Sequence, residues 1–128
     1  MNVEFRSKEL ARVCNSDSAR LATYGPDGSA VIRRRLGQLL AAVRLADMRT
    51  FPGTRIRTAL TGGRHTVLLA AGPTLDVLLR PGKDDAPADL PLDEEWVKSV
   101  VIDDIVSITA ASKSARSTAA PARKRISQ

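Results

Sequence analysis

The chain has little cysteine and little histidine, and each scarcity excludes a kind of chemistry. Cys14 is the only cysteine and His65 the only histidine among 128 residues. A single cysteine permits no disulfide within the chain, and a single histidine excludes an RNA-cleaving mechanism that uses two. Cys14 falls in an apolar helical pattern, so we interpret it as a small buried hydrophobic residue; a reactive or metal-binding thiol is the alternative.

Other absences remove further classes of function. The chain does not open with a basic segment followed by an apolar one, and no apolar run is long enough to cross a bilayer. We therefore expect a cytoplasmic protein without a membrane partner. The sequence also lacks metal-ligand spacing, a glycine-rich phosphate loop and a nucleophile elbow, so we predict no metal and no cofactor.

Basic residues are in excess. The sequence has 20 Lys and Arg against 14 Asp and Glu, which gives a net charge of +6 and a pI near 10.2. This charge favours polyanionic partners, because each phosphate that Arg or Lys neutralises releases bound counterions. We predict one folded domain over residues 1–111 and a disordered basic tail over 112–128, which has almost nothing to bury. A solvated terminus is our interpretation of the tail, with a nucleic-acid-binding arm as the alternative.

The first half of the chain has helical periodicity, after a short predicted strand at residues 3–5. Ser7 suits the N-cap of a helix that begins at Lys8, and residues 15–17 break that helix and cap a second segment. Residues 25–28 are expected to end the second segment, because they contain two glycines and a proline. A principal helix is then predicted over residues 29–45, with a core stripe made of Ile32, Leu36, Leu39, Leu40 and Val43.

An arginine run, Arg33, Arg34 and Arg35, lies within the principal helix. It is either a solvated helix face or a platform for RNA phosphates or an acidic protein segment. Successive helical residues point about 100° apart, so we expect Arg35 to face differently from its neighbours.

The second half has strand periodicity, and Pro52-Gly53 marks the change. One strand is predicted to begin at Thr54 or Arg55, and three more to cover residues 65–71, 75–80 and 97–109. Residues 81–92 are predicted to form an acidic loop. Asp103-Asp104 interrupts the last apolar run and indicates either a bulge or two short strands. We predict an α+β fold in which two or three helices cover one face of a curved, mainly antiparallel sheet of four to five strands.

The segment DMRTFPG, residues 47–53, is followed by Leu60-Thr61-Gly62 and by Arg64. This series resembles the signature "DMRTLPG…LTGDRKG" of HigB-like toxins in the RelE/ParE superfamily. Those are small bacterial toxins of type II toxin–antitoxin pairs, some of which cleave mRNA on the ribosome. Segments at residues 5–15, 76–81 and 92–108 resemble further family motifs in the same order. The resemblance covers about residues 2–109 and implies a RelE-like fold.

The resemblance also implies an activity, partners and site residues. It implies a ribosome-dependent endoribonuclease that acts on mRNA and pairs with a helix-turn-helix antitoxin encoded next to it. Arg64 matches the arginine of "GDRKG", and His65 stands where the family has lysine. These two residues are the expected catalytic pair, although a structural role for His65 is the alternative. The expected RNA-binding residues are Arg55, Arg57, Arg33 and Arg34.

The chain departs from the family pattern at several functional positions. Asp76 stands where the family has an arginine, and Ala110, Ala111 and Ser112 stand where it has a closing Tyr-His. These departures affect function more than fold. They leave an active mRNA-cleaving toxin and a catalytically degenerate relative that binds antitoxin, RNA or both as competing hypotheses. An unrelated small basic α+β domain is the third.

Overall fold

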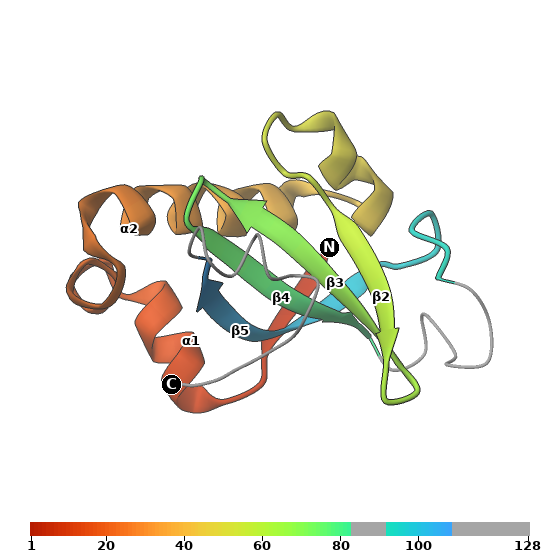
Figure 1. Cartoon of the computed structure of the whole chain (residues 1–128), viewed down its shortest axis with the longest axis horizontal. Coiled ribbons are helices and arrows are strands. Elements are labelled where there is room, and N and C mark those ends of the chain that lie inside the picture. The colour runs from red at the N-terminus through yellow and green to blue at the C-terminus, as the bar shows by residue number, and fades with distance from the viewer. Residues whose placement is uncertain (83–91, 109–128) are drawn as a thin grey trace.

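The computed structural model describes residues 1–82 and 92–108, and the predictions for the tail and for most of the acidic loop lie outside them. The chain folds as helices beside a five-stranded sheet (Figure 1). The helical elements are α1 (Lys8–Asn15), α2 (Asp17–Ala41) and a 3-10 helix, η1 (Leu45–Thr50). The strands are β1 (Asn2–Phe5), β2 (Arg57–Thr61), β3 (Arg64–Ala71), β4 (Leu75–Pro81) and β5 (Ser99–Ser107).

The sheet has the order β1-β5-β4-β3-β2. The strands β2 to β5 pair antiparallel with their neighbours, while β1 pairs parallel with β5, so the sheet is mixed. Opposite β4, the register shifts: Leu78 pairs with Asp104 and Leu79 with Ile102, which leaves Asp103 as an extra residue. The predicted bulge and the α+β class are confirmed, and the RelE-like identity of the fold stays a prediction.

Side-chain caps define both helix starts. The Ser7 hydroxyl accepts a hydrogen bond from the Leu10 N–H at 3.1 Å, and the Ser16 hydroxyl accepts one from the Ala19 N–H at 3.2 Å. Each bond satisfies an N–H group that has no partner within its helix. The two predicted helix starts are confirmed.

The boundaries of the principal helix differ from the prediction. Gly25, with φ 78° and ψ 173°, is non-helical and divides α2 into two helices across a kink, so the second predicted segment ends there as expected. The next helix begins at Pro26 rather than Ser29. Proline suits a first helical turn, where its missing N–H has no partner to lose. The helix ends at Ala41 rather than Leu45. Beyond it, the Asp47 carboxylate accepts hydrogen bonds from the N–H groups of Val43 and Arg44.

The start of the second strand was also predicted too early. The strand β2 begins at Arg57, because Arg55 has a φ of 39°, in the left-handed region that a strand does not use. Thr54 precedes it and is buried, with its hydroxyl donating to the Met48 carbonyl at 3.0 Å. The connection from η1 to the sheet is therefore held by local hydrogen bonds.

The core lies between α2 and one face of the sheet, which we call the helix-side face. Its sheet residues are Val67, Leu69, Ala71, Leu75, Val77, Leu79, Val100, Ile102 and Ile105. Ile32 and Leu39 of α2 are buried against them, as predicted, but Leu40 and Val43 are 63% and 69% exposed. Leu36 is partly buried against the core, and Arg35 is 4% exposed, so the buried side of the helix runs through residues 32, 35 and 39 and leaves Leu40 on the outer side.

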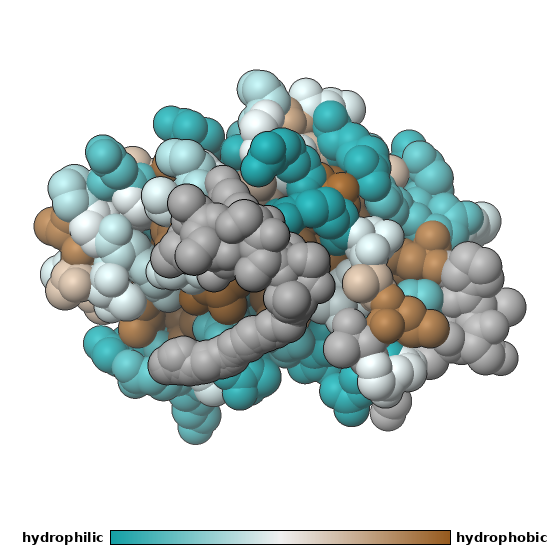
Figure 2. All heavy atoms as spheres, viewed as in Figure 1, coloured by the Kyte–Doolittle hydropathy of each residue, from teal (hydrophilic) through white to brown (hydrophobic). Residues whose placement is uncertain are grey.

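The other face of the sheet is covered by no helix of the described residues and is called the open face. Strand residues alternate between the two faces, so Thr66, Leu68, Asp76, Leu78 and Arg80 belong to it. Hydrophilic residues cover much of the described surface in the space-filling view, with apolar groups between them (Figure 2). Among the described residues, no helix is long and apolar enough to cross a membrane, and the cytoplasmic location stays a prediction.

Candidate functional site

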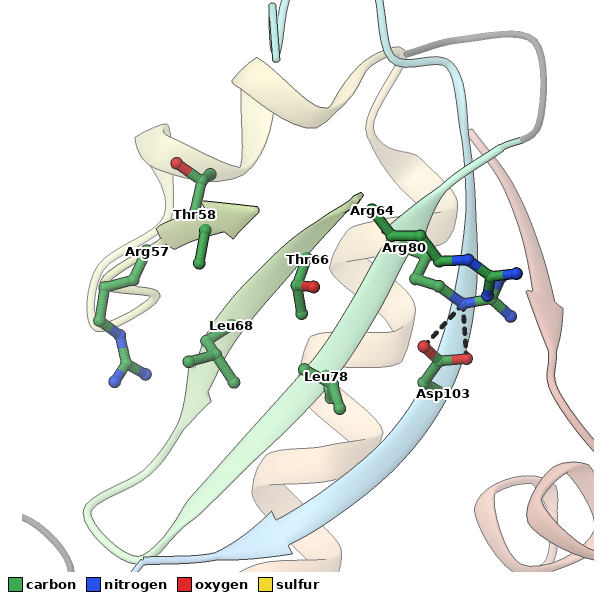
Figure 3. Close-up of a pocket in the computed structure, with 9 residues that line it drawn as sticks. Arg57, Thr58, Arg64, Thr66, Leu68, Leu78, Arg80 and Asp103 are labelled. Atoms are coloured by element: carbon green, nitrogen blue, oxygen red, sulfur yellow. Dashed lines mark hydrogen bonds and ion pairs between the residues drawn. The ribbon is translucent and has the colours of Figure 1, made fainter. Parts of the chain in front are cut away.

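The open face contains a cavity of about 530 Å³ bordered by residues of four neighbouring strands. Leu68 and Leu78, which pair across β3 and β4, supply apolar surface between its two ends. Arg57, Arg64 and Arg80 also line it, one from each of three strands (Figure 3). A concave surface with an apolar centre and guanidinium groups around it suits a ligand that is partly flat and apolar and partly anionic.

One end of the cavity carries a close ion pair between β2 and β4. A terminal nitrogen of Arg57, Nη2, lies 2.6 Å from Oδ1 of Asp76. The Asp76 side chain is 6% exposed, whereas that of Arg57 is about half exposed. A carboxylate shielded from water needs such a partner, because an unpaired buried charge is strongly unfavourable.

The other end carries a second ion pair, between β4 and β5. Nε of Arg80 lies 2.6 Å and 2.8 Å from the two carboxylate oxygens of Asp103. Asp103 is the extra residue of the bulge, and its backbone carbonyl accepts a hydrogen bond from Nε of Arg6 at 2.8 Å. An inserted residue re-aims the side chain at its position, which here directs a carboxylate toward Arg80.

Arg64 stands at this same end. Its side chain and that of Arg80 point to one side of the cavity in Figure 3. Arg64 is exposed, and its side chain makes no hydrogen bond or ion pair with the described part of the chain. Among the described residues that line this end, there are therefore two guanidinium groups and one carboxylate, which is bonded to Arg80, and the end keeps a positive charge available to an anion.

The expected catalytic pair is not brought together. Arg64 and His65 are consecutive residues of β3, so their side chains leave opposite faces of the sheet. Arg64 points to the open face, while His65 shares the helix-side face with Val67 and is half-buried. The period of two in a strand was visible in the sequence and already separates these side chains.

The expected RNA-binding arginines are divided in the same way. Of the four, only Arg57 lines the cavity. Arg55 lies before β2, and its carbonyl accepts a hydrogen bond from Nε of Arg57 at 3.3 Å. Arg33 and Arg34 are exposed on α2, which lies behind the sheet when the cavity faces the viewer (Figure 3). Neither of them lines the cavity.

Sequence reasoning missed Arg80 and Asp103 as site residues. Arg80 has the same strand parity as Asp76 and Leu78, so alternation alone could have placed all three on one face. The pairing of Arg80 with Asp103 depends on the register between β4 and β5, which no local pattern reveals.

Two other titratable groups lie in the helical layer, apart from the cavity. Cys14 is 1% exposed, and burial raises the pKa of its thiol to about 11. Burial likewise raises the pKa of Tyr24 to about 12. The interpretation of Cys14 as a small buried residue is confirmed, because a protonated, enclosed thiol is a poor nucleophile.

No group of three or more His, Cys, Asp or Glu side chains in residues 1–82 and 92–108 is placed to hold a metal ion. Comparison with known proteins finds no family that matches the chain, and neither a curated protein nor a solved structure is significantly similar to it.

Proposed function

We propose that the protein is the RelE/HigB-like toxin of a type II toxin–antitoxin pair and that it binds mRNA in the cavity of the open face. The observation that carries this proposal is the convergence of Arg57, Arg64 and Arg80 around an apolar centre. The resemblance of residues 47–53 and of Arg64 to the family signature supports the toxin identity.

The chemistry of the cavity matches single-stranded RNA. Guanidinium groups bind phosphate oxygens through paired, charge-assisted hydrogen bonds. The half-buried side chains of Leu68 and Leu78 offer apolar surface that an unstacked base can cover. The net charge of +6 adds a general attraction toward a polyanion.

A catalytically degenerate binding protein is the second candidate, and a specific observation favours it. The charged groups that line the cavity are three arginines and Asp103, which is bonded to one of them. Histidine is the side chain that most often transfers protons in catalysis, and none is among the described residues that line the cavity. In this candidate the protein holds a helix-turn-helix antitoxin, RNA or both, without cleaving the RNA.

Induced expression in a bacterial host, with growth and total mRNA followed together, tests the toxin proposal. An active toxin arrests growth and depletes mRNA, and co-expression of the adjacent gene restores both. Arg64→Gln is expected to relieve the arrest, because it removes the cavity arginine whose side chain has no partner among the described residues. Arg33→Gln is the matched control: it removes an equally exposed arginine from α2 and is expected to leave toxicity unchanged.

His65→Ala then separates the two candidates. Loss of mRNA cleavage in this variant, with the fold intact, restores His65 to a catalytic role and contradicts the degenerate candidate. Normal growth and intact mRNA with well-expressed, folded wild type favour the degenerate candidate. Failure of the purified protein to bind single-stranded RNA, together with normal growth, contradicts RNA binding in both.

A further inference from the structure

The two ends of the cavity differ in the charge that they offer. At one end Arg57 faces Asp76 at 2.6 Å, a cation matched by an anion. At the other end Arg64 and Arg80 line the cavity with one carboxylate of the described residues, that of Asp103. Counting the described residues, the first end is neutral as a pair, and the second keeps one positive charge.

The neutral end is hard for a phosphate to invade. A phosphate that drew Arg57 away would leave the Asp76 carboxylate, 6% exposed, without its cation. Removing one partner of a buried pair is strongly unfavourable, and a phosphate beside a carboxylate is repelled. Arg64 has no described partner to displace, so a phosphate meets no such opposition there.

We propose that Asp76 is a specificity-determining residue of the cavity, which neutralises Arg57 and confines phosphate contact to the end formed by Arg64 and Arg80. This inference rests on the proposed RNA binding of the open face. It makes the site directional: one phosphate is held at the Arg64 end, and the rest of the nucleotide extends over Leu68 and Leu78 toward Arg57.

The salt dependence of RNA binding measures how many phosphates are neutralised. For single strands, the logarithm of the binding constant falls with the logarithm of salt concentration by about 0.7 per phosphate contacted. Asp76→Asn keeps the shape and an acceptor for Arg57 but removes the negative charge. It is expected to release Arg57 for a second phosphate and to steepen the slope by about 0.7. A fourfold rise in salt then weakens binding about 2.6-fold more in the variant than in wild type.

The experiment is a fluorescence-anisotropy titration of a labelled single-stranded RNA with the full chain at several potassium chloride concentrations. Glu9→Gln is the matched control. Glu9 pairs with Arg12 at 2.5 Å on α1, so this variant also loses one carboxylate beside an arginine, but away from the cavity. It is expected to leave the slope near that of wild type. Arg64→Gln is expected to make the slope shallower by about 0.7, because one phosphate contact is lost.

The variant Arg57→Gln/Asp76→Asn removes both charges of the pair and keeps the inference testable if Asp76→Asn does not fold by circular dichroism. Its slope is expected to equal that of wild type, and a slope shallower than wild type by about 0.7 overturns the inference. If the wild type binds RNA and the folded Asp76→Asn variant shows the same slope, the inference is overturned and the proposed RNA binding is not. Absence of binding by both proteins overturns the proposed RNA binding together with it.

Discussion

The two faces of β3 show how one strand divides its residues between folding and ligand binding. On the helix-side face, Val67 and Leu69 are fully buried under α2. On the open face, Leu68 is half-buried in the cavity and Arg64 is exposed. An antiparallel strand with one covered and one uncovered face can commit alternate residues to each task. Fold and site are therefore encoded in the same segment with little overlap.

The arginines of the two layers show the same division. Arg35 is 4% exposed and donates hydrogen bonds to the Ala70 carbonyl at 2.7 Å, to Gln38 Oε1 at 2.9 Å and to the Pro52 carbonyl at 3.4 Å. No described carboxylate pairs with it, and burial lowers its pKa. Arg35 therefore ties α2 to the sheet and to the turn after η1, whereas Arg64 is left available to a ligand.

The largest expected effect comes from truncating one leucine on each face of β3. Leu69→Ala is expected to lower the free energy of unfolding by about 3 kcal/mol, because it opens a cavity in the core. Leu68→Ala, one residue away on the open face, is expected to cost about 1 kcal/mol. Urea denaturation of both variants measures the difference. Equal losses would contradict the division between the faces.

A smaller difference is expected between the reactivity of a thiol in the helical layer and that of a thiol in the cavity. The pKa of Cys14 is about 11, so its thiolate fraction at pH 8 is about 100-fold below that of a thiol with the ordinary value. We expect iodoacetamide to alkylate Cys14 about 100-fold more slowly than a cysteine placed in the cavity by Thr66→Cys in a Cys14→Ala background. The rate is expected to rise in urea, and equal native rates for the two thiols would argue against burial of Cys14.

The smallest effect separates the buried and exposed arginines of α2. Arg35→Met leaves the Ala70 and Pro52 carbonyls without their donor and is expected to lower the free energy of unfolding by about 2 kcal/mol. Arg33→Met, on the exposed side, is expected to change it by less than about 0.5 kcal/mol. Thermal unfolding of both variants provides the measurement, and a stabilised Arg35→Met protein would show that the buried charge is a net cost.

The local features of this fold were readable from the sequence. The caps at Ser7 and Ser16 and the bulge at Asp103 depend on residues close to one another in the chain, and the structure confirms all three. The expectation that Arg35 faces differently from Arg33 and Arg34 is confirmed, because Arg35 is buried and the other two are exposed. Its burial in place of Leu40 was not predicted, because hydrophobicity alone assigns a leucine to the core. Only the carbonyls of Ala70 and Pro52, far away in sequence, make the buried guanidinium acceptable.

Which residues share a face of each strand follows from the amino-acid sequence alone, and this separates Arg64 from His65 whatever the strands pair with. Which charges meet depends on how the strands are paired in the fold. Arg57 reaches Asp76 across 19 positions of the chain, and Arg80 reaches Asp103 across 23. The physical reason is that alternation is a property of one strand's backbone, whereas the register between strands is set by the burial of the whole helix-side face.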